Sequence, residues 1–121
     1  MKPNLIILYV ADPDRSAAFY EDLLGAAPVE RSPTFAMFVF PGGIRLGLWS
    51  RNAVEPAVTG STGAFEIDVP LASAADVDTV FVRVSAAGAT ILQEPAEMEF
   101  GRNFMLADPD QNRIRFYNPP A

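Results

Sequence analysis

The feature that most constrains the fold of this chain is an internal repeat of predicted elements. A strand, a helix and then short strands occur twice, with corresponding points about 60 residues apart. Gly25 and Gly88 each follow a predicted helix, where glycine commonly ends one. The repeat predicts an α+β fold of two modules, residues 1–55 and 62–121, within one domain. The alternative is a single ferredoxin-like domain followed by an unrelated tail.

The first copy of the pattern is defined by strand and cap signals. Leu5–Val10 has the length and the β-branched content of a buried strand. Asp12 is a good helix N-cap, and Pro13 suits the first helical position. Two strands are then predicted over 34–40 and 44–50, because a Pro-Gly-Gly turn separates two runs of strand-forming residues.

The second copy follows residues 51–63, whose small and polar composition predicts a linker. It begins with a strand over 65–69. Ser73 and Asp76 then form a start like a capping box, ahead of a helix with an apolar face at i, i+3, i+4 and i+7. Three short strands are predicted near 90–93, 102–107 and 113–117.

Composition excludes several kinds of site. The chain has neither cysteine nor histidine, so thiolate chemistry, disulfides and imidazole metal ligands are ruled out. A net charge of -6 disfavours nucleic acid, which requires basic surfaces. The run Leu5–Val10 is too short to span a membrane, and Lys2 alone is a poor basic region for a signal peptide. We therefore expect a cytoplasmic protein with no nucleic-acid or membrane partner.

Two motifs, in this order, resemble those of a known superfamily. One is a short turn motif, Asp108-Pro109-Asp110-Gln111-Asn112, and the other is the set Val10, Asp12, Ser16, Phe19, Tyr20, Leu23, Leu24 and Gly25. Together they resemble the terminal and first-module signatures of the glyoxalase/bleomycin-resistance/dioxygenase, or vicinal-oxygen-chelate, superfamily. The resemblance covers almost the whole chain. It implies two βαβββ modules whose curved sheets enclose a cleft.

Shorter segments resemble the phenazine-antibiotic-resistance type within that superfamily. They are Pro3-Asn4-Leu5, Leu48-Trp49-Ser50, Glu55-Pro56 and Phe100-Gly101-Arg102-x-Phe104. Proteins of that type bind and sequester planar aromatic antibiotics, usually as dimers whose clefts draw on both chains. A homodimer is also expected because a second copy could cover the open edges of the short strands.

The resemblance also implies where a metal would be held in the superfamily's enzymes, which use four side chains, typically His and Glu. Alignment places Leu5, Gly47, Ala64 (or Thr62) and Arg115 at those positions. A guanidinium would repel the ion, and the other side chains carry no suitable ligand atom. We therefore predict no metal and no cofactor. Two patterns that begin like calcium loops, at 12–16 and 108–112, lack the required glycine and glutamate and are interpreted as cap and turn chemistry.

Strand alternation predicts which side chains line the cleft. Residues two positions from an aligned position point to the same face, so they should also face the cleft. Besides the residues predicted to bind a ligand, these are Ile7, Arg45, Asp68, Arg113 and Tyr117. The predicted ligand-binding residues are Tyr9, Phe35, Met37, Gly47, Trp49, Glu66, Phe104 and Arg115.

Several of these assignments leave alternatives open. Trp49 stacks on a flat ligand or fills a core or dimer interface. Gly47 leaves room for a ring or marks a β-bulge. Arg115 pairs with Glu66, binds a ligand carboxylate or stays exposed. Phe104 belongs, with its neighbours from residue 100, to a loop that closes the cleft or to ordinary turn packing.

One further assignment depends on the first hairpin. If Phe40 pairs with Ile44, then Phe35 and Met37 lie opposite Trp49 and Gly47. A two-residue turn would instead present Ala36 and Phe38 to the cleft.

The leading functional hypothesis is non-catalytic sequestration of a planar aromatic antibiotic or related metabolite, with no catalytic residue assigned. The alternatives are a metal-dependent enzyme, a metal-free enzyme with Glu66 or Asp68 as base, and a structural dimer without a ligand. The charge of the ligand stays open. The acidic chain favours a cationic drug of the bleomycin kind, whereas Arg45 and Arg115 favour a carboxylated phenazine.

Overall fold

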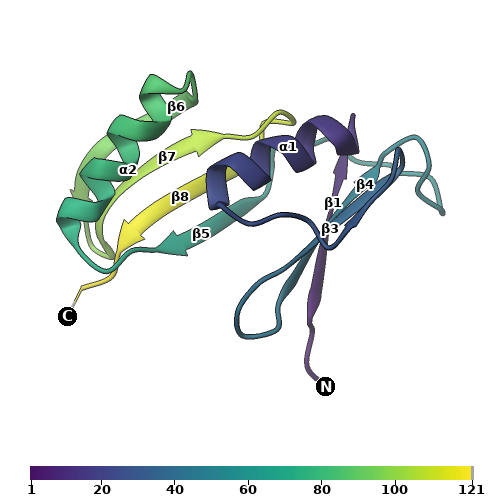
Figure 1. The fold of residues 1–121 in the computed structure, drawn as a ribbon, viewed down its shortest axis with the longest axis horizontal. Helices are drawn as coiled ribbons and strands as arrows, with labels where there is room; N and C mark the ends of the chain where they lie inside the picture. The colour runs from purple at the N-terminus through teal and green to yellow at the C-terminus, as the bar shows by residue number, and fades with distance from the viewer. Residues whose placement is uncertain (121) are drawn as a thin grey trace. The chain divides into compact units, whose positions relative to one another are not determined.

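The computed structural model describes residues 1–120, which form two compact units, Met1–Thr62 and a second that begins at Gly63. Each unit has the element order βαβββ and consists of a four-stranded mixed sheet with one helix (Figure 1). The predicted α+β class and the pair of βαβββ modules are confirmed. The boundary lies inside the stretch predicted as a linker. None of the helices in residues 1–120 is long and apolar enough to cross a membrane.

Module 1 is the unit that ends at Thr62. Its elements are β1 (Leu5–Val10), α1 (Pro13–Leu24), β2 (Glu30–Arg31), β3 (Phe35–Val39) and β4 (Arg45–Ser50). The sheet order is β1-β4-β3-β2, with β1 and β4 parallel and the other pairs antiparallel. The Asp12 carboxylate caps α1 by accepting hydrogen bonds from the backbone N–H groups of Asp14 and Arg15, and Gly25 ends it at φ 69°. The two-residue strand β2 was not predicted, because two residues show no alternation.

The core of module 1 lies between α1 and one face of the sheet. Tyr20 of α1 is fully buried, and its ring lies edge-on to Phe38, with the centroids 6.5 Å apart. The other buried residues of this layer come from both elements: Leu8, Val10, Ala17, Leu23, Ala36, Leu46 and Leu48. Alternate residues of each strand point into this core, so the residues between them project from the opposite face of the sheet.

The hairpin between β3 and β4 has the register that decides the open assignment. The Phe40 N–H donates to the Ile44 carbonyl at 2.9 Å. Phe35 therefore lies opposite Trp49, and Met37 lies opposite Gly47. This is the predicted pairing, and the two-residue turn is excluded.

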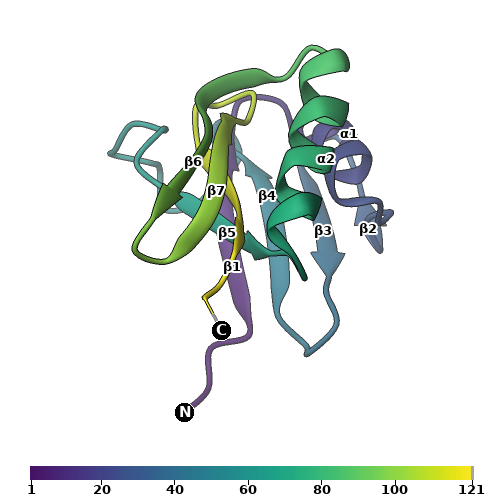
Figure 2. The same ribbon diagram turned by 90° about the vertical axis from the view of Figure 1, so that its left-hand side faces the viewer.

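Module 2 repeats the arrangement with different side chains. Its elements are β5 (Glu66–Pro70), α2 (Ala74–Ala86), β6 (Thr90–Met98), β7 (Gly101–Ala107) and β8 (Arg113–Asn118). The sheet order β5-β8-β7-β6 matches that of module 1 (Figure 2). The Ser73 side chain caps α2 by accepting a hydrogen bond from the Asp76 N–H, as the capping-box pattern predicts.

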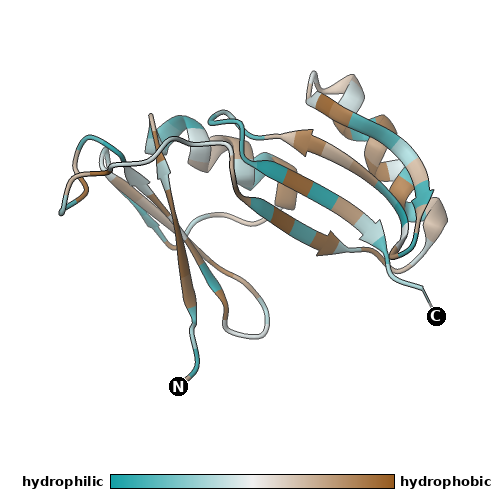
Figure 3. Ribbon diagram, turned by 180° about the vertical axis from the view of Figure 1, so that it is seen from behind, coloured by the Kyte–Doolittle hydropathy of each residue, from teal (hydrophilic) through white to brown (hydrophobic). Residues whose placement is uncertain are grey.

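Strand β6 is longer than predicted, extending to Met98 instead of ending near residue 93. Its pairing with β7 shifts register twice, between Ile91 and Gln93 and between Gln93 and Ala96. These irregularities interrupt the simple alternation by which a strand is found in a sequence. Hydropathy bands alternate clearly along β5, whereas β1 is apolar over most of its length (Figure 3).

The turn between β7 and β8 uses the residues that imitate a calcium loop. The buried Asp108 carboxylate accepts hydrogen bonds from the backbone N–H groups of Asp110 and Asn112, both at 2.8 Å. Gln111 adopts φ 69°, so it takes the left-handed conformation usual for glycine. The Asp108 carboxylate is thus engaged in holding the turn, which agrees with its interpretation as turn chemistry.

Candidate ligand-binding faces

Each sheet has one face away from its helix, and these two open faces hold nearly all the predicted site residues. In module 1 this surface, called the apolar face below, consists of three cross-strand rows: Tyr9–Trp49–Phe35, Ile7–Gly47–Met37 and Leu5–Arg45–Val39. Tyr9 is 43% exposed and Leu5 40%, although both are large hydrophobic residues on regular strands. The strand periods of β1, β3 and β4 thus bring five predicted ligand-binding residues together: Tyr9, Phe35, Met37, Gly47 and Trp49.

The centre of the apolar face is shaped by Gly47. A Cβ atom at this position would lie 3.1 Å from Cζ of Phe35 and 3.2 Å from Cγ1 of Ile7. The room that glycine leaves is therefore occupied by the ring of Phe35, which also lies edge-on to Trp49 at 6.4 Å and 89°. Both neighbouring strands keep their register past Gly47, so the alternative of a β-bulge is excluded.

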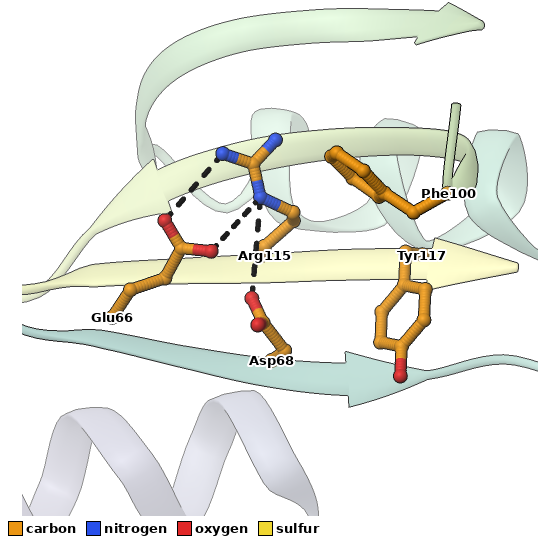
Figure 4. A pocket seen from close by; sticks show the side chains of 5 residues that line it. All are labelled: Glu66, Asp68, Phe100, Arg115 and Tyr117. Carbon is orange, nitrogen blue, oxygen red and sulfur yellow. Dashed lines mark hydrogen bonds and ion pairs between the residues drawn. The ribbon is translucent and has the colours of Figure 1, made fainter. Parts of the chain in front are cut away.

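The open face of module 2 is organised around Arg115. Its Nε donates to Oε2 of Glu66 at 3.0 Å, and its Nη2 donates to Oε1 of the same carboxylate at 3.5 Å. Figure 4 shows this two-point pairing, together with a longer ion pair of 3.9 Å from Nε to Asp68, which lies on β5 like Glu66. Of the three roles considered for Arg115, pairing with Glu66 is therefore the one observed. The Arg115 side chain is only 14% exposed, so it is held within the face.

The remaining guanidinium nitrogen of Arg115 is held by a residue that sequence reasoning missed. Nη1 donates to Oδ1 of Asn103 at 2.6 Å, and this oxygen also accepts a hydrogen bond from Gln93 at 2.9 Å. Asn103 is fully buried, and its amide nitrogen donates to the carbonyls of Ala96 and Gly101. The sequence did contain a signal for this residue. Asn103 occupies the position written x in the motif Phe100-Gly101-Arg102-x-Phe104, and it is a polar residue within a predicted strand.

A pocket of about 320 Å³ opens beside Arg115. It is lined by Glu66, Asp68, Phe100, Arg115 and Tyr117 (Figure 4). The Phe100 ring lies 5.2 Å from the Arg115 guanidinium carbon, a distance that permits a cation–π contact. Asp68 and Tyr117 had been placed on this face by alternation, but neither had been assigned to a ligand.

The two carboxyl groups of the pocket differ in their acidity. The hydrogen bond from Arg115 lowers the pKa of Glu66 below its usual range. Burial, together with the hydrogen bond and the charge of the adjacent Glu66 carboxylate, raises the pKa of Asp68 to about 6. At neutral pH both groups are largely ionised, and in mild acid Asp68 is the one that takes up a proton.

Phe104 does not belong to either open face, and its predicted ligand-binding role is wrong. It is fully buried on the helix side of β7, stacked on Phe116 at 5.3 Å and edge-on to Phe81 of α2 at 5.4 Å. Of the predicted loop, Phe100 lies in the turn before β7, whereas Arg102 and Phe104 lie in the strand itself. Phe104 therefore alternates with Asn103 and Met105 and points to the opposite face of the sheet.

The positions aligned with the superfamily's metal ligands do not fit a metal. In module 1 they are Leu5 and Gly47, which lie in adjacent rows of the apolar face. In module 2 the guanidinium of Arg115 occupies the last position and is paired with Glu66. Within residues 1–120 the structure contains no group of three or more Asp, Glu, His or Cys side chains placed to hold an ion.

Comparison with known families defines the class of protein. Residues 2–116 match the model of the Glyoxalase/Bleomycin resistance protein/Dioxygenase superfamily. The chain therefore belongs to this superfamily.

Individual proteins that resemble this chain are more specific than the superfamily model. The phenazine antibiotic resistance protein EhpR of Enterobacter agglomerans is 31% identical over 116 residues, covering 93% of this chain and 88% of EhpR. A protein from Agrobacterium tumefaciens, solved by NMR, is 45% identical with a TM-score of 0.88, covering 100% of this chain and 99% of that one. A glyoxalase-related enzyme from Fulvimarina pelagi is 26% identical with a TM-score of 0.84, covering 99% and 89%. Antibiotic resistance is therefore represented among the relatives of this chain.

Proposed function

We propose that this protein binds and sequesters a planar aromatic antibiotic or a related small metabolite, without turnover. The observation that carries the proposal is the apolar face, where the lone tryptophan, Phe35 and Tyr9 form one row on a regular sheet. Flat aromatic molecules gain about 0.5–1.5 kcal/mol per ring contact beyond simple burial. The similarity to EhpR, a phenazine resistance protein, supports the same ligand class.

Sequestration protects by mass action, so it requires affinity and abundance and no catalytic group. We extend the proposal to a cytoplasmic homodimer, because the apolar face leaves large hydrophobic side chains exposed in one chain. Sedimentation at micromolar concentration tests this assembly, and a monomer would contradict it.

The binding experiment uses calorimetry with phenazine and related three-ring compounds. Trp49→Ala should lower the affinity at least tenfold, since stacking and burial are both lost, and Trp49→Phe should keep part of it. Phe65→Ala is the control, because Phe65 is an exposed aromatic residue (37%) ahead of β5 and outside the apolar face. Unchanged affinity in Trp49→Ala would contradict the stacking model.

A second candidate is a metal-free enzyme, and the raised pKa of Asp68 favours it. A carboxyl group with a pKa of about 6 inside a pocket has the acidity of a general acid or base near neutral pH. Mass spectrometry of candidate ligands after incubation distinguishes the two functions. Product that forms with the wild type and disappears with Asp68→Asn would favour catalysis, whereas unaltered ligand would favour sequestration.

A further inference from the structure

The charge of the ligand follows from how Arg115 is engaged. Three of its five N–H groups donate to oxygen, two to Glu66 and one to the buried Asn103, and Nη1 and Nη2 also lie 4.0 Å and 3.9 Å from the sulfur atoms of Met98 and Met105. A ligand carboxylate would have to displace Glu66 and would then lie beside two carboxyl groups of the pocket. Arg115 therefore serves as a structural counter-ion of Glu66, and it offers no free donor pair to an anion.

Asp68 is the carboxyl group of the pocket that pairs more weakly with Arg115, because Glu66 lies closer, at 3.0 Å from Nε. Its nearest approach to the guanidinium is 3.9 Å, and its side chain is 49% exposed. Among the five lining residues, two ionised carboxylates and one guanidinium leave a net charge of -1. The other two lining residues, Phe100 and Tyr117, present aromatic rings to the same space (Figure 4).

We propose that this pocket binds a flat aromatic cation, with Asp68 as its counter-ion and Phe100 and Tyr117 as its walls. Aromatic ring faces attract cations, and the attraction is strongest where water is partly excluded. This inference rests on the proposed function and names the charge of its ligand. It replaces the expectation that Arg115 selects a carboxylated compound.

The test holds the ring system constant and varies its charge. Calorimetric titration compares N-methylacridinium, acridine and acridine-9-carboxylate at about pH 7.5, where the three are cationic, neutral and anionic. From the usual strengths of cation–π contacts and exposed ion pairs, the cation should bind roughly tenfold more tightly than the anion. Equal or tighter binding of the anion would overturn the inference while leaving sequestration of aromatic compounds intact.

Substitutions in the pocket test whether the preference for the cation arises there. Asp68→Asn should remove most of the advantage of the cation over acridine, and circular dichroism shows that the variant is folded. Asp22→Asn, an exposed carboxylate on α1, is the control with the same change of charge. Phe100→Leu should weaken the cation by a few fold. A preference for the cation that survives Asp68→Asn would overturn the inference, and failure of all three compounds to bind would overturn the proposed function as well.

Proton concentration supplies an independent readout. The titratable and charged groups that surround Asp68 on this face are Glu66 on β5 and Arg113, Arg115 and Tyr117 on β8. N-methylacridinium keeps its charge between about pH 5 and about pH 7.5, so a change in its affinity reports on the protein. The affinity should rise with pH over this range in the wild type and stay flat in Asp68→Asn. A flat wild-type profile would contradict the role of Asp68.

Discussion

The two modules share one sheet order, and strands β1, β4 and β3 pair in the same register as β5, β8 and β7, yet the open faces differ in chemistry. Strand pairing places Gly47 in module 1 where module 2 has Arg115, and Ile7 where module 2 has Asp68. The first face is an apolar surface with aromatic rings, and the second is an ion-pair network beside a pocket. The comparison teaches that the fold sets the positions, whereas a few side chains at equivalent positions set what each face can bind.

A third pair of equivalent positions, Phe35 in module 1 and Asn103 in module 2, shows which interactions stabilise each open face. Phe35 lies opposite Trp49, and Asn103 lies at the corresponding place opposite Tyr117. The ring of Phe35 fills the space over Gly47, whereas the amide of Asn103 fixes Arg115. Module 1 therefore relies on packing at this position and module 2 on hydrogen bonds.

The largest effect on stability is expected at this pair. Asn103→Leu should lower the free energy of unfolding by about 3 kcal/mol, because Arg115 and Gln93 lose a shared acceptor in a buried place. Phe35→Leu should cost only about 1 kcal/mol, since the ring is half-buried and leucine keeps part of the contact. Urea unfolding measures both, and equal losses would contradict the contrast between the two faces.

The next effect concerns the two arginines of the open faces. Arg115→Met should cost about 2 kcal/mol, because Glu66 and the buried Asn103 both lose the guanidinium that donates to them. Arg45, at an exposed position on the apolar face, should tolerate the same substitution within about 0.5 kcal/mol. Thermal unfolding at matched pH compares them. A similar loss at both sites would show that Arg115 contributes only as a surface charge.

Gly47→Ala probes the packing of the apolar face with a single methyl group. The new Cβ would press on Phe35 and Ile7, so we expect a loss of about 1 kcal/mol and a shift in Trp49 emission as the Phe35 ring moves. Gly60→Ala is the control, because a Cβ there has nothing within 4 Å. Unchanged emission in Gly47→Ala would mean that Phe35 does not depend on the missing side chain.

The smallest expected effect is the contribution of Asp68 to the pH dependence of folding stability. Its pKa is raised from 3.8 to about 6, so the folded state binds more protons than the unfolded state between these values, and stability falls as pH rises through them. Asp68→Asn should therefore raise the melting temperature slightly at neutral pH and leave it unchanged near pH 4. Solvent screening of a half-exposed group keeps the gain to about 1–2 °C. A loss of stability at neutral pH would contradict this sign.

Much of the fold could be predicted because its signals are local. Asp12, Ser73 and Gly25 act as caps through contacts with residues close in sequence. Alternation along β1 and β4 then placed Tyr9 and Trp49 on one face, since successive strand residues point to opposite sides. The same rule failed where β6 changes register and where Phe104 was assigned to a loop instead of a strand.

The sequence by itself determined the repeat, the caps, the faces of the regular strands and the lack of metal ligands at the aligned positions. Only the tertiary structure decided that the Phe35 ring occupies the room over Gly47 and that every nitrogen of Arg115 already has an acceptor. The physical reason is that these contacts join side chains on different strands. Their partners depend on cross-strand register and side-chain conformation, which local periodicity does not encode.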